Sequence, residues 1–139
     1  MYGQMFARVD HEPQILRITV INERASDGEF SRLIESAEEA YRSRGHPFVL
    51  LLDLTRMNQI PLPQAMAWID LFHRVMPITR ERLICTCLCF RDDLVRAAVQ
   101  LFLALYNPVK PFFIHATVEE CDECASRNIQ AMTVPRRQE

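Results

Sequence analysis

The segment 48–63 constrains the fold of this chain more than any other. Five apolar residues, 48–52, are followed directly by Asp53-Leu54-Thr55 and then by a turn that contains Pro61 and Pro63. An apolar run of strand length without alternation is typical of a strand buried on both faces of a parallel sheet. The carboxyl ends of such strands are where α/β proteins usually bind their ligands. The segment therefore predicts a parallel sheet that delivers Asp53 and Thr55 to an edge suited to a functional site.

The rest of the chain alternates between strand and helix patterns. In chain order we expect strands at about 4–9 and 14–21, a helix from Ser26 to Gly45, the strand 48–52, a helix from Pro61 to Met76 that Pro77 closes, a strand at 83–90, a helix at 93–106, a strand at 112–115 and a helix from Thr117 to Ala131. This ββαβαβαβα order predicts an α/β fold: a mixed sheet with an N-terminal hairpin and covering helices. We expect one domain at 1–134 and a short tail at 135–139.

Composition excludes several classes of function. A net charge of −2 argues against a nucleic-acid partner, because phosphate binding needs a concentrated positive surface. The longest apolar runs are far shorter than the ~20 residues that cross a bilayer, so we expect no membrane span. The N-terminus lacks the pattern of a secretory signal, and an odd count of 5 cysteines does not suggest a disulfide framework. These features predict a cytoplasmic protein with reduced thiols.

The cysteines form two motifs. Cys85, Cys87 and Cys89 alternate along one strand and so share a face, where small apolar side chains commonly pack. Cys121 and Cys124 form a Cys-x-x-Cys motif, but the Thr117 cap places it a turn too late to gain from the helix dipole, and neighbouring acids disfavour a thiolate. Packing is the better interpretation of both motifs. A redox or zinc role that includes His115 is the weaker alternative, and we predict no metal site and no cofactor.

Polar residues follow three of the predicted strands and make up a candidate functional surface. Its members are Asp53, Thr55, Arg56, Asn58, Arg91, Asp92 and His115. An enzyme would draw on five of them, namely Asp53, Thr55, Arg91, Asp92 and His115. The same residues also fit helix caps and solvated turns, and no nucleophile can be assigned to a base. We therefore predict no catalytic residues, and favour a protein that is not an enzyme.

The predicted helix 93–106 carries more apolar side chains than packing on a sheet requires. Its surplus suggests an interface formed by Val99, Phe102, Leu103 and Tyr106. Two alternatives are left open for what covers this surface. One is a neighbouring helix or the C-terminal tail of the same chain; the other is a partner, a second protomer or a ligand.

The element order, the strand that ends in Asp53-Leu54-Thr55, and the closing segment 113–120 together resemble the STAS domain of anti-sigma factor antagonists and sulfate transporter tails. More specifically, the chain is similar to the small SpoIIAA-like proteins. In phosphoswitch members of that family an Asp-Ser-Ser-Gly segment carries the phosphorylated serine. The matching positions here are Pro61-Leu62-Pro63-Gln64, which offer no hydroxyl, so the resemblance does not extend to the usual switch. Thr55 is the nearest hydroxyl, and whether it is modified is left open.

These observations favour a non-enzymatic protein-interaction or regulatory module of STAS-like type that lacks the phosphorylatable serine. It would present the region 55–63 and the helix 93–106 to a protein partner or to another copy of itself. The alternative is a small-molecule or lipid carrier, because the SpoIIAA-like group is also similar in organisation to the Sec14-type lipid-exchange fold. Its apolar pocket would lie between the helix 93–106 and the sheet, gated by the loop 56–63.

Overall fold

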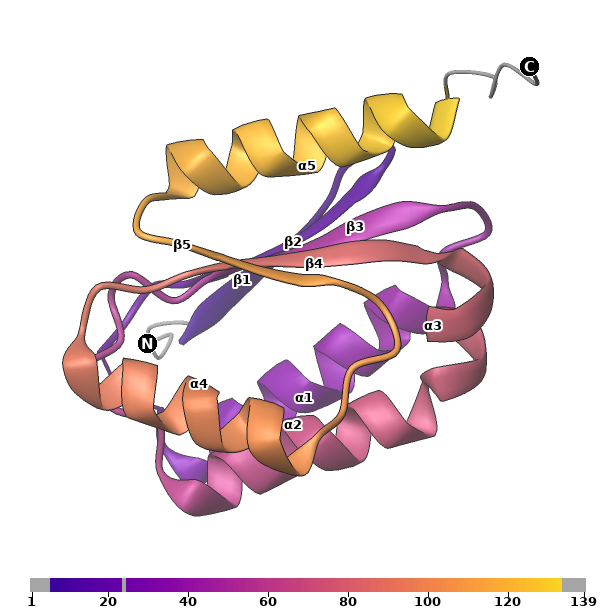
Figure 1. Cartoon of the computed structure of the whole chain (residues 1–139). Helices are drawn as coiled ribbons and strands as arrows, with labels where there is room; N and C mark the ends of the chain where they lie inside the picture. Colours follow the sequence, from indigo (N-terminus) through magenta and orange to yellow (C-terminus); the bar gives the residue numbers. More distant parts are fainter. Residues whose placement is uncertain (1–5, 24, 134–139) are drawn as a thin grey trace.

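The computed structural model describes residues 6–23 and 25–133, and within them the chain forms one five-stranded mixed sheet (Figure 1). The strands are β1 (Ala7–His11), β2 (Ile15–Val20), β3 (Phe48–Asp53), β4 (Leu83–Cys89) and β5 (Phe112–His115), and they lie side by side in chain order. The first pair is antiparallel and the other three pairs are parallel. This confirms the predicted α/β fold with an N-terminal hairpin. Positions 4 and 5 of the expected first strand, and the expected tail 135–139, lie outside the described residues.

The helices form two unequal layers on the sheet. They are α1 (Asp27–Arg42), α2 (Leu62–Arg74), α3 (Met76–Arg82), α4 (Asp93–Leu105) and α5 (Val118–Thr133). Figure 1 shows α1, α2 and α4 together on one face, while α5 lies alone across the other. Among the described residues, no helix combines the length and the apolar character that crossing a membrane requires.

Both predicted capping boxes are present. At the start of α1, Ser26 Oγ accepts a hydrogen bond from Glu29 N (3.2 Å), while Glu29 Oε1 accepts one from Ser26 N (2.8 Å). Before α5, Thr117 Oγ1 accepts from Glu120 N and Glu120 Oε1 accepts from Thr117 N, each at 3.2 Å. Such caps satisfy backbone donors that the helix itself leaves unpaired, and each stabilises its helix by about 1 kcal/mol.

The structure corrects the role of Pro77, which does not close a helix. The helix α2 ends at Arg74, and α3 follows after Val75 with Pro77 in its first turn. Proline is well tolerated there, because the first turn of a helix has no intrahelical partner for its N–H groups. The carbonyl of Val75 accepts from both Ile78 N (2.9 Å) and Thr79 N (3.0 Å), which starts the new helix. The element order is therefore ββαβααβαβα.

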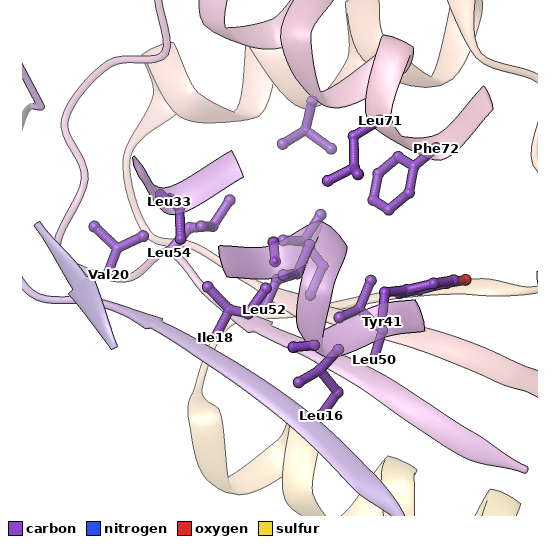
Figure 2. Close-up of a cluster of buried hydrophobic side chains, with 14 of the residues drawn as sticks. Leu16, Ile18, Val20, Leu33, Tyr41, Leu50, Leu52, Leu54, Leu71 and Phe72 are labelled. Atoms are coloured by element: carbon purple, nitrogen blue, oxygen red, sulfur yellow. The ribbon is translucent and has the colours of Figure 1, made fainter. Parts of the chain in front are cut away.

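The larger core lies between the sheet and the layer of α1, α2 and α4. The parallel register places Leu16 beside Leu50 and Ile18 beside Leu52 on this face. Figure 2 shows these four side chains on the same side of the strands as Leu33 and Tyr41 of α1 and as Leu71 and Phe72 of α2. All residues of 48–52 are at most 6% exposed, so β3 is buried on both faces as its sequence predicts.

A smaller core fills the space between the sheet and α5. It consists of short side chains from β3, β4 and α5, namely Val49, Leu51, Cys85, Cys87, Cys89, Cys121, Cys124 and Ala125. Arg17 of β2 links the sheet to α5. Its Nε donates to Glu12 Oε2 (2.7 Å), and its Nη2 donates to Asp122 Oδ1 on α5 (2.6 Å). The five cysteines thus gather in one buried cluster.

Candidate functional site

Two of the predicted site residues, Asp53 and His115, end the parallel strands β3 and β5, which lie on either side of β4. The register pairs Asp53 with Cys89 and Cys89 with His115, so these residues form a row across the carboxyl ends of β3, β4 and β5. The Cys89 thiol donates to Asp53 Oδ1 over 3.6 Å. The His115 ring is partly buried, and its Nε2 has no hydrogen-bond partner within the described residues. The sheet therefore places Asp53 and His115 in one row, with β4 between them.

The side chain of Asp53 is hydrogen-bonded to Thr55. Asp53 Oδ1 accepts hydrogen bonds from Thr55 N (3.0 Å) and from Thr55 Oγ1 (2.6 Å). This is the pattern by which an aspartate stabilises a local turn. This turn follows β3, and in it the Thr55 hydroxyl donates its hydrogen bond to Asp53. Modification of Thr55 would have to break that hydrogen bond.

The remaining candidates lie apart from this row. Asp92 is the N-cap of α4, where its Oδ1 accepts from Leu94 N (2.7 Å). Asn58 Nδ2 donates to Glu23 Oε2 (3.1 Å), and Arg56 borders an open groove beside the same glutamate. Arg91 is exposed. The predicted surface is thus divided between a strand-end row, a helix cap and a loop contact, and it does not converge on a single reacting centre.

The buried cysteines have thiols of low reactivity, because the pKa values of three of them are raised. The Sγ atoms of Cys85 and Cys87 lie 3.9 Å apart. The hydrogen bond with Cys85, together with burial, raises the pKa of Cys87, and the hydrogen bond with Cys89 and burial raise that of Cys121. Burial raises the pKa of Cys124 to about 11. Neutral thiols are poor nucleophiles, so this arrangement supports packing.

No group of three or more His, Cys, Asp or Glu side chains has an arrangement that would hold a metal ion in the part of the chain that the structure describes.

The predicted interface on α4 needs correction. Val99 and Tyr106 are 5% and 3% exposed, and Phe102 and Leu103 are partly buried. The rings of Phe102 and Tyr106 lie 5.7 Å and 5.5 Å from that of Phe72 on α2, so a neighbouring helix of the same chain covers this side. The apolar side chains that α4 leaves in solvent are instead Leu94, Leu101 and Leu105, at 66%, 45% and 53% exposure.

An apolar cavity lies under α4, at the carboxyl end of the sheet. Its volume is about 50 Å³. Its walls come from the residue before β1, from β2–β5, from α1, α2 and α4, and from the loop after β3. The lining residues are Phe6, Val20, Phe30, Leu33, Leu52, Leu54, Met57, Ile60, Gln64, Ala65, Trp68, Leu88, Ala98, Val99, Phe102 and Phe112. This is the place in the fold where the alternative function requires a pocket, and Met57 and Ile60 come from the loop expected to gate it.

Gln64 is the residue that sequence reasoning missed. It lines the cavity at 8% exposure, and its Oε1 is buried without a hydrogen-bond partner among the described residues. The signal was present in the sequence: a glutamine three residues after a proline at a helix start. A glutamine at that position normally bonds the backbone N–H of the N-cap residue, and proline has none.

Comparison with known proteins identifies the fold. An uncharacterised protein of the DUF3478 family from Shewanella loihica PV-4, solved with a SpoIIAA-like fold, superposes with a TM-score of 0.59 at 11% sequence identity, over 90% of this chain and 98% of that one. This chain has a SpoIIAA-like fold. No protein-family model matches the sequence, and no curated protein matches it.

Two prolines lie at the start of α2. Pro61 is the N-cap, Pro63 lies in the first turn, and no side chain caps the helix. Leu62 is 55% exposed, whereas Gln64 turns inward to the cavity wall. The start of α2 is thus an apolar surface beside an apolar cavity.

Proposed function

We propose that this protein is a non-enzymatic interaction module of STAS-like type, and that its partner at the outer face of α4 is a second copy of the same chain. The supporting observation is the exposed apolar face formed by Leu94, Leu101 and Leu105. Large exposed apolar residues gathered on one helix usually mark an interaction surface.

The pattern of this face suits pairing with itself. Leu94, Ala97, Leu101 and Ala104 recur at spacings of three and four, so they lie on one side of the helix, and all four are exposed. In an antiparallel pair, each leucine meets the small alanines of the other copy, which lets the two helices approach closely. Asp93 at one end of α4 and Lys110 beyond the other end carry opposite charges that such a pair brings together.

A non-enzymatic role is supported by the chemistry of the candidate residues. Asp53 and Asp92 are engaged in a turn and a helix cap. The pKa values of three buried thiols are raised, which keeps them protonated near neutral pH. Five free, buried cysteines are also suited to a reducing compartment, and we propose a cytoplasmic location on this basis.

The test is the mass of the purified protein in solution, measured by light scattering over a range of concentrations. We expect a reversible dimer for the wild type and a monomer for Leu101→Asp, which places a charge in the centre of the interface. Met132→Asp is the control, because Met132 is also exposed (58%) but lies on α5, across the sheet. A wild type that stays monomeric at high concentration would refute the proposal.

A second candidate function is favoured by a separate observation, the apolar cavity under α4. Pockets of apolar lining with very few polar groups are typical of small-molecule sites, and this one lies at the carboxyl ends of parallel strands. A carrier of a small apolar molecule would use it. Native mass spectrometry of gently purified protein tests this directly: we expect an additional mass that denaturation releases, and a bare polypeptide would argue against it.

A further inference from the structure

We propose that the cavity under α4 binds a small, uncharged, apolar molecule that carries one hydrogen-bond donor, and that Gln64 Oε1 accepts this hydrogen bond. The inference rests on the second candidate function, the carrier, and specifies the class of its ligand. It is carried by a buried polar atom without a hydrogen-bond partner on Gln64, the one polar residue among the described residues that line the cavity.

Gln64 is as buried as a core residue, but its side-chain oxygen has no hydrogen-bond partner among the described residues. Only 8% of the residue is exposed. Buried polar side chains in native proteins nearly always have a hydrogen-bond partner, because an unpaired one is costly to desolvate. A ligand hydroxyl or N–H group in the adjoining cavity supplies the missing donor.

The backbone explains why the amide is free to serve this role. Gln64 occupies the third position of α2, and its own N–H is bonded to the carbonyl of Pro61 (2.9 Å). Its side chain cannot close a capping box, since the N-cap residue is Pro61, which lacks an N–H. The side chain therefore has no local partner to return to and lines the cavity instead.

The size and charge of the cavity limit what can bind. The cavity volume of about 50 Å³ holds roughly four water molecules, at about 10–15 Å³ for each. A short or branched fragment fits this volume, and an entire acyl chain does not. Of the described residues in its wall, none carries a formal charge, so an anionic head group has no counter-charge inside. Both facts point to a small neutral molecule.

The chain contains its own reporters for this site. Trp68, the single tryptophan of the sequence, lines the cavity, and so does Met57. Met66 is 42% exposed and is absent from the cavity wall. Binding should change the fluorescence of Trp68 and shift the methyl NMR signal of Met57, while the methyl signal of Met66 stays in place.

The experiment titrates the whole protein with sec-butanol and with butanone, which share a carbon skeleton but differ in the hydroxyl donor. We expect the alcohol to bind about fivefold more tightly, or more, because only it can donate to Gln64 Oε1. In Gln64→Met, which keeps the length of the side chain and removes the acceptor, this preference should vanish. Gln100→Met is the matched control, since Gln100 is exposed on α4 and should leave the preference intact.

A cavity-filling variant separates the two levels of the proposal. Ala98→Leu places additional carbon atoms in the cavity and should abolish binding of both probes. If neither probe affects the wild type, the carrier function and the ligand class both fail. If both probes bind equally and Ala98→Leu removes both, the carrier stands but the donor requirement is wrong. Tighter binding of butanone would overturn it as well, by showing that the amide presents its N–H group.

Discussion

The two faces of the sheet are packed in different ways. On one face, α1, α2 and α4 meet over β2–β4 with large side chains, and the rings of Phe72, Phe102 and Tyr106 contact one another across two helices. On the other face, α5 alone covers a cluster of five cysteines with one valine, one leucine and one alanine. The first face contains the apolar cavity; the second contains the thiols.

The difference shows how the number of covering helices affects packing. Where three helices converge on one sheet, large rigid rings must fill an irregular space, and a gap is left at the carboxyl ends of the strands. Where one helix lies across the sheet, short side chains bring helix and sheet close together, and Cys121 and Ala125 are fully buried. We therefore expect ligand binding on the three-helix face and structural rigidity on the α5 face.

The strongest consequence of this contrast concerns thiol reactivity. The five cysteines are buried, so an aqueous thiol reagent should modify them only after unfolding. For a domain of ordinary stability, the modification rate of the folded protein should be lower than that of the denatured protein by a factor on the order of 10³ or more. The measurement is the rate of reagent uptake with and without denaturant. Fast modification of Cys121 or Cys124 in the folded state would show that α5 opens readily.

The same thiols predict a loss of stability at high pH. Burial raises the pKa of Cys124 from an ordinary value of 9.0 to about 11, and the pKa values of Cys87 and Cys121 are raised as well. Between these values the unfolded chain releases protons that the folded chain retains, so deprotonation favours unfolding. The thiols should not change stability below about pH 9, and they should lower it as the pH approaches 11. Denaturant titrations across this range check it, with Cys124→Ala as the variant that should show a shallower decline.

Adding volume to each face should distinguish them. Ala125→Leu enlarges a fully buried residue under α5 and should destabilise the protein by about 1–3 kcal/mol through overpacking. Ala98→Leu projects into the cavity and should be neutral or stabilise by up to about 1 kcal/mol. The free energies of unfolding of the two variants provide the comparison. Equal destabilisation would mean that the two faces are packed alike.

A smaller effect is expected from Gln64→Met in the ligand-free protein. The substitution removes a buried acceptor without a partner and should stabilise the fold by about 1 kcal/mol. Thermal or chemical unfolding measures this, and Gln100→Met on the surface should change stability little. Destabilisation by Gln64→Met would indicate that the amide is already satisfied.

The smallest effect is expected at the side of the α5 face, where Arg17 links Glu12 and Asp122. Arg17→Met keeps the apolar stem and removes both ion pairs, and it should cost about 0.5–1 kcal/mol because the carboxylates are partly exposed. The loss should shrink at high salt. A much larger cost would show that this contact, and not the small-residue core, holds α5 on the sheet.

Much of the fold was predictable because its signals are local. The apolar run 48–52, the capping boxes at Ser26 and Thr117, and the alternation of Cys85, Cys87 and Cys89 each depend on residues near one another in sequence. Pro77 is the exception, because a proline can follow the end of one helix or lie in the first turn of the next, and the turn at Val75 decides which.

The sequence by itself determined the order of the five strands, the burial of β3 and the shared face of the cysteines, because backbone periodicity and capping act within a few residues. The tertiary structure alone decided which side of α4 is covered, and that Gln64 borders a cavity. These features depend on segments that are distant in the chain and on how well their side chains fill a shared space. An apolar pattern specifies that a face will be buried, but the volumes of the neighbours decide what covers it and what gap is left.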